Sequence, residues 1–124
     1  MHTRILMSAS AALMAVIGLA ATFLPQELLA LHGSVADKPT VLFVQMAGAV
    51  YLGFAVLNWG ARGILIGGIY ARPLAGANFL HFVMVAITLA KAALGAGALE
   101  LALSAAVFGV FAAWFGWVLF RPPV

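Results

Sequence analysis

The sequence predicts an all-α protein, an integral membrane four-helix bundle with a short interfacial helix after helix one. Hydrophobic residues make up 66% of the 124 residues and charged residues 7%, whereas soluble domains have about 45–50% and about 25%. Four apolar segments are each long enough for one crossing, which needs about 20 residues. A soluble domain of this length could not hide so much apolar surface, so we expect lipid around one domain covering residues 1–124.

The first crossing is predicted at about residues 5–24. A secretory signal peptide is the alternative, with Arg4 as its charged region and Gly18-Leu19-Ala20 as a small-x-small cleavage site. We expect a retained helix. Residues 25–39 form the only polar loop of any length. Pro25 suits the first turn of a short helix at the membrane surface, with an apolar face of Leu28, Leu29 and Leu31, which Gly33 ends with His32 beside it.

Three further crossings follow a turn at residues 36–39. They are predicted at about residues 40–59, 73–94 and 98–120. The connector Ile64 to Ile69 is apolar but too short to span, so we expect a kinked extension at the interface. Gly95 and Gly97 should break the third crossing and leave a tight turn.

The placement of Lys and Arg predicts the orientation. With four crossings, one side of the membrane holds Arg4, Arg62, Arg72 and Arg121, and the other holds Lys38 with all three acids. Because cationic loops stay in the cytoplasm, we expect a multi-pass membrane protein with both termini inside. The cations form no cluster, so no nucleic-acid partner is predicted, and the lack of cysteine excludes disulfides and thiolate chemistry.

Small residues predict where the last crossing packs. At about 100° per residue they fall within an arc of roughly 120°, with Phe111, Trp114 and Val118 on the far side. The predicted helix-packing residues are Ala102, Ala105, Ala106, Gly109, Ala112, Ala113 and Gly116. Because small residues let helices approach closely in lipid, this face should meet another helix of the bundle or a second copy of the protein.

Polar residues on the second and third crossings mark a tentative ligand site. Tyr51 and Asn58 share one helix face, and Asn78 and His81 share another with Thr88 and Lys91. Because unpaired polar groups are costly in lipid, both faces should point into the bundle. His81 could relay protons, ligate haem or bind a ligand by a hydrogen bond, and its alternative role is an interhelical hydrogen bond to Asn58 or Tyr51.

The sequence holds no metal-ligand cluster, no nucleophile with a base and no glycine-rich phosphate loop. We therefore predict no catalytic residue, no metal and no cofactor. Lys91, near the end of its helix, could reach the interface or pair with Glu100 across the turn.

Three segments carry a resemblance, namely FLPQELLALHG, AGAVYLGFAVLNWGAR and RPLAGANFLHF. Together they resemble a broad group of small bacterial four-span membrane proteins, classed as a domain of unknown function and loosely similar to the DoxX-like proteins. The pattern covers most of residues 20 to 85, with a proline after helix one, Asn-Trp near the end of helix two and Asn-x-x-His in helix three. The resemblance implies four helices and no established activity, and it supplies no catalytic residue.

These observations favour a non-enzymatic membrane protein, either a structural or accessory subunit of a larger membrane complex or a self-associating one. Its expected partners are the lipid bilayer and itself or that complex. The alternative is a small-molecule binder or transporter with a polar pocket between helices two and three.

Overall fold

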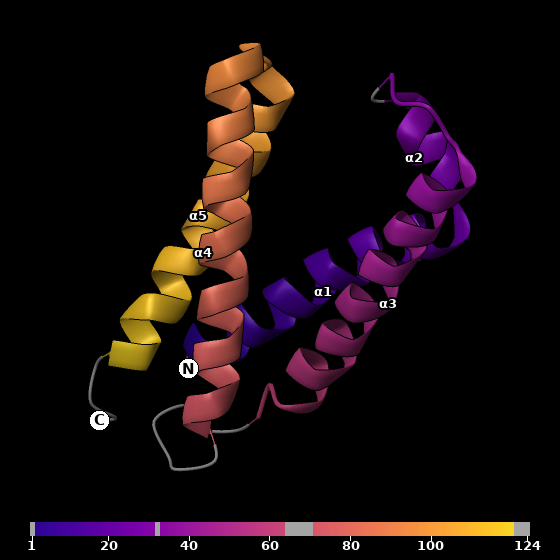
Figure 1. Ribbon diagram of the computed structural model, residues 1–124. Coiled ribbons are helices and arrows are strands. Elements are labelled where there is room, and N and C mark those ends of the chain that lie inside the picture. The colour runs from indigo at the N-terminus through magenta and orange to yellow at the C-terminus, as the bar shows by residue number, and fades with distance from the viewer. Residues whose placement is uncertain (1, 32, 64–70, 121–124) are drawn as a thin grey trace. The chain divides into compact units, whose positions relative to one another are not determined.

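The computed structural model describes residues 2–31, 33–63 and 71–120, and these residues form helices and turns without a strand. The helices are α1 (His2–Phe23), α2 (Pro25–Leu31), α3 (Lys38–Gly60), α4 (Ala71–Ala96) and α5 (Leu99–Phe120) (Figure 1). All except α2 are long and apolar enough to cross a membrane. The prediction of an all-α chain with four membrane-length helices and a short helix after the first is confirmed.

The chain divides into two compact units. The first contains α1, α2 and α3, and the second contains α4 and α5. The two units are described separately below, and the single four-helix domain over residues 1–124 stays a prediction. The predicted extension at Ile64 to Ile69 and the placement of His32 lie outside the described residues.

Two glycines end helices in the left-handed backbone conformation that other residues rarely adopt. Gly33 has φ of 70°, its amide donates to the Ala30 carbonyl, and the Ser34 amide donates to the Leu29 carbonyl. This pair of bonds is the Schellman arrangement that follows many helices. Gly97, with φ of 65°, ends α4 by a single bond from its amide to the Ala93 carbonyl.

The helix boundaries differ slightly from the predicted ones. α3 begins at Lys38 because Asp37 caps it, its carboxylate accepting a 2.9 Å hydrogen bond from the Thr40 amide. The predicted turn at residues 36–39 is therefore already partly helical. α4 includes Gly95 and runs to Ala96, so only Gly97 breaks it. A lone glycine inside a helix costs only about 1 kcal/mol relative to alanine.

In the first unit, α1 and α3 pack closely through glycines. A Cβ placed on Gly18 would lie 2.8 Å from the Leu52 side chain, and one on Gly48 would lie 2.8 Å from the Thr22 backbone nitrogen. As residue numbers rise along α1 they fall along α3, so the two helices are antiparallel (Figure 1). Small residues at such a crossing allow the backbones to approach, which is how helices gain contact in lipid.

In the second unit, α4 and α5 pack antiparallel through aromatic rings. Phe82 of α4 is fully buried, and its ring centroid lies 5.5 Å from Phe108, 5.2 Å from Phe111 and 5.6 Å from Phe115, all on α5. One turn away, Phe79 fills the space beside Gly116. The contact between this helix pair therefore depends on phenylalanine rings seated against small residues.

Candidate functional site

A buried polar contact joins α3 to α1. The Asn58 side-chain amide donates a 3.1 Å hydrogen bond to the Ser10 hydroxyl, and that hydroxyl donates to the Met7 carbonyl over 3.1 Å. Ser10 and Asn58 are both fully buried. Asn58, predicted as a ligand-binding residue, thus has partners within its own helix pair, as expected for polar groups that hold helices together in lipid.

A second polar contact lies farther along the same pair. The Gln45 side-chain amide donates to the Thr22 carbonyl over 3.3 Å, and Thr22 also lies against Gly48. Tyr51 lies between the two polar contacts along α3 and is half-buried. The buried residues of α3 are Gly48, Ala55 and Asn58. Tyr51 lies seven residues before Asn58, two helical turns away, and therefore on the same side of α3, as predicted.

The other two predicted ligand-binding residues belong to α4. Asn78 is fully buried, and its amide donates to the Leu74 carbonyl over 3.0 Å. The half-buried ring of His81 makes edge contacts with Phe82 at 5.1 Å and with Phe108 at 6.4 Å. The structure therefore places His81 at the border of the aromatic contact between α4 and α5.

The four predicted ligand-binding residues are divided between the two units. Tyr51 and Asn58 belong to the first unit, and Asn78 and His81 belong to the second. Each pair shares a helix, as predicted. Convergence of the two pairs on one pocket stays a prediction.

Thr88 and Lys91 lie outside the contact between α4 and α5, and the prediction that their face points into a four-helix bundle stays a prediction. Both are exposed, and the Thr88 hydroxyl donates to the Met84 carbonyl of its own helix over 2.8 Å. A hydroxyl satisfied in this way needs no partner on another helix. Lys91 and Glu100 are both exposed as well, and the described residues show no ion pair between them.

The predicted small-residue face of α5 is divided by the contact with α4. Ala112 and Gly116 are buried, Ala105 and Gly109 are half-buried, and the remaining members Ala102, Ala106 and Ala113 are exposed. A Cβ on Gly109 would meet no atom within 4 Å. Only one edge of this face therefore packs within the α4–α5 unit.

Phe111 and Val118 lie opposite the small-residue face of α5, as the helical period predicts, but this side is not left without contacts. The Phe111 ring stacks on Phe82, and Val118 is buried. Because both faces of α5 are apolar, hydropathy could not indicate which one meets α4. Phenylalanine rings fill the space between the two helices, and the side of α5 that meets α4 is accordingly centred about a quarter turn from the small-residue face.

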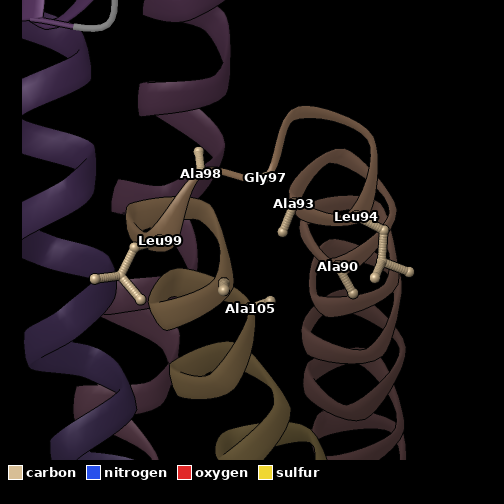
Figure 2. Close-up of a pocket in the computed structure, with 8 residues that line it drawn as sticks. Ala90, Ala93, Leu94, Gly97, Ala98, Leu99 and Ala105 are labelled. Carbon is tan, nitrogen blue, oxygen red and sulfur yellow. The ribbon is translucent and has the colours of Figure 1, made fainter.

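Each helix pair also has an open apolar hollow. Small residues of α4 and α5 line the first, beside the turn at Gly97 and Ala98 (Figure 2). It is lined by Ala90, Ala93, Leu94, Gly97, Ala98, Leu99, Ala102 and Ala105. The second hollow, between α1 and α3, is lined by Ala11, Ala12, Ala15, Leu52, Ala55, Val56, Trp59 and Gly60.

The chemistry available to these groups is limited. The described residues contain no group of three or more His, Cys, Asp or Glu side chains that could hold a metal ion. Asn58, Ser10 and Gln45 can donate and accept hydrogen bonds but do not exchange protons near neutral pH.

No family model, no curated protein and no solved structure matches this chain.

Sequence reasoning missed Ser10, which the structure shows to be the partner of Asn58. A signal was present, because residues 5–24 contain only three polar side chains, Ser8, Ser10 and Thr22. Two of these three residues contact α3, Ser10 through its hydroxyl and Thr22 through its backbone carbonyl. A search for polar pairs in antiparallel register between the first and second crossings would have found the Ser10–Asn58 contact, whereas Gln45 bonds to the backbone carbonyl of Thr22.

Proposed function

We propose that this chain is a multi-pass subunit of a bacterial inner membrane that has no catalytic centre of its own and assembles with a second copy of itself. The observation that carries the proposal is the part of the small-residue face on α5 that α4 leaves open. It consists of Ala102, Ala106, Gly109 and Ala113, which are exposed or half-buried.

Close approach of two helices explains why such a face would associate. Lipid chains are as apolar as leucine, so burial alone does not bring helices together in a membrane. Association depends on dispersion contacts and weak Cα–H hydrogen bonds, which form when small residues let two backbones come near. α1 and α3 already use this geometry at Gly18 and Gly48.

The disposition of polar groups in the first unit also favours a structural role. Asn58 and Gln45 each bond across to α1, so these amides hold the helix pair together. We also propose that the chain is related to the small four-span membrane proteins that are loosely similar to the DoxX-like proteins.

Charge supports an orientation with both termini in the cytoplasm. Because Ser10 contacts Asn58, Arg4 and Arg62 belong to the same end of the antiparallel α1–α3 pair. Glu27 and Asp37 belong to the opposite end, where α2 precedes α3. Cations favour the cytoplasmic side of a membrane, so the end with the arginines is assigned to the inside.

The test is the mass of the purified protein in mild detergent, for the wild type and for Gly109→Leu. The account expects a dimer for the wild type and a monomer for the variant. The added side chain has open space within the α4–α5 unit, so each monomer should stay folded. Gly53→Leu is the matched control, because Gly53 of α3 is exposed and, like Gly109, would have no atom within 4 Å of an added Cβ. A monomeric wild type, or a dimeric Gly109→Leu, would overturn the proposal.

A further inference from the structure

The hollow between α1 and α3 ends at a fixed arginine. Trp59 lines the hollow, and the Arg62 guanidinium lies 4.0 Å from the centroid of its indole ring. Arg62 also donates to the Trp59 carbonyl over 2.6 Å. A cation–π contact and a hydrogen bond thus hold one face and one donor of the guanidinium, and a guanidinium has five N–H donors in total.

Among the described residues of the first unit, no acidic side chain neighbours this charge. None of the described residues forms an ion pair with Arg62. The acids of the first unit, Glu27 and Asp37, precede α3, whereas Arg62 follows it. The 23 residues of α3 separate the two ends by about 35 Å. Arg4, at the same end as Arg62, adds a second positive charge there.

The hollow has the length and lining of a site for one acyl chain. From Leu52 to Gly60 it follows α3 for about 12 Å, which is close to one leaflet of a hydrocarbon core about 30 Å thick. All of its lining side chains are apolar, and three of them, Ala11, Ala12 and Ala15, are small enough to leave space beside α3. Trp59 stands at the end where an aromatic side chain would anchor at the headgroups.

From this juxtaposition we infer that the hollow binds one anionic phospholipid, with an acyl chain between α1 and α3 and the phosphate on Arg62. Guanidinium groups match phosphate oxygens through paired N–H donors. An uncharged lipid would fill the hollow but would leave the positive end of the helix pair without a counter-charge. The site lies on α1 and α3 and is independent of the association surface on α5.

Native mass spectrometry of the protein tests this, after equilibration with equal amounts of phosphatidylglycerol and phosphatidylcholine of the same chain length. Lipids are counted per protein chain in every peak, monomer or dimer, so the result does not depend on self-association. The wild type should retain phosphatidylglycerol about fivefold over phosphatidylcholine, the preference expected for one arginine near an anionic lipid. Arg62→Gln should abolish that preference, and Arg72→Gln, which removes an exposed charge from α4, should keep it.

A second variant blocks the chain rather than the phosphate. Ala12→Phe should fill the hollow and remove the retained lipid, while Ala49→Phe, on an exposed position of α3 that does not line it, should not. Circular dichroism confirms that each variant is folded, and Ala12→Phe decides the question if Arg62→Gln does not fold. Equal retention of both lipids by the wild type, or an unchanged preference in Arg62→Gln and unchanged retention in Ala12→Phe, would overturn the inference.

Discussion

Asn58 of α3 and Ser10 of α1 form a buried hydrogen bond of 3.1 Å between residues 48 positions apart in the sequence. It fixes the register of the antiparallel pair, together with the Gln45 contact to Thr22 farther along. A shift of one helix by a single residue would rotate one partner away from the other. Because lipid offers neither group another hydrogen-bond partner, this register is favoured over its neighbours.

A double-mutant cycle measures that bond. Asn58→Ala and Ser10→Ala should each lower the free energy of unfolding in detergent, and their coupling should be about 0.6 kcal/mol and at most about 1.7 kcal/mol. Thr88→Ala is the control, because its hydroxyl bonds only to its own helix at an exposed position. Zero coupling would mean that the bond does not hold the two helices together.

Alanine substitution of glycines tests the close approach of α1 and α3. Gly48→Ala should destabilise the protein by about 1–3 kcal/mol, because the new Cβ would lie 2.8 Å from the backbone nitrogen of Thr22. Gly53→Ala, on the same helix with open space around it, should leave stability unchanged or raise it by up to about 1 kcal/mol. Thermal unfolding of the two variants compares them directly, and equal stability would contradict the close contact.

The aromatic contact between α4 and α5 predicts a large effect at Phe82. Its ring touches three phenylalanines, and each pair contributes about 0.5–1.5 kcal/mol beyond burial. Phe82→Ala, which removes these contacts and leaves a cavity, should therefore cost about 3–5 kcal/mol in unfolding free energy. Phe43→Ala, with a side chain 70% exposed on α3, should cost little. Similar losses in the two variants would count against the cluster.

The sequence predicted which segments are helical more fully than it predicted how they face each other. Length and hydropathy indicate helices in lipid, and Pro25, Gly33 and Gly97 mark ends that the structure confirms. Which side of α5 meets α4 was not predictable, because its small-residue face and its aromatic face are equally apolar. Hydropathy therefore favours neither face. The choice depends on how rings such as Phe82 fill the space beside α5, which is a property of packing.

The candidate site shows the same division. That Tyr51 and Asn58 share a face follows from helical periodicity. The identity of the Asn58 partner does not follow from periodicity, because Ser10 is 48 residues away and only the register of the two helices brings the two residues together. The hydroxyl of Thr88 bonds to its own helix, and the presence of a polar residue in a crossing does not reveal that option.

Acidification should weaken the start of α3. Hydrogen bonds from the Thr40 hydroxyl and amide lower the pKa of Asp37 from its usual 3.8. A carboxyl group whose pKa is lower when folded stabilises the fold above 3.8, and that stabilisation is lost as the pH falls through the lowered value. The melting temperature should therefore decrease as the pH is lowered past 3.8. Asp37→Asn, which keeps a capping side chain, should lose this part of the pH dependence. An identical pH profile in the two proteins would show that the cap does not titrate.

Disulfide crosslinking in membranes tests the proposed association through α5 most directly, because the chain has no cysteine of its own. Ala113→Cys puts one thiol on the exposed part of the small-residue face, and Val107→Cys puts one on a different exposed face of the same helix. Mild oxidation should convert Ala113→Cys to a covalent dimer and leave Val107→Cys monomeric. No dimer from Ala113→Cys, or equal dimer from both variants, would contradict the account.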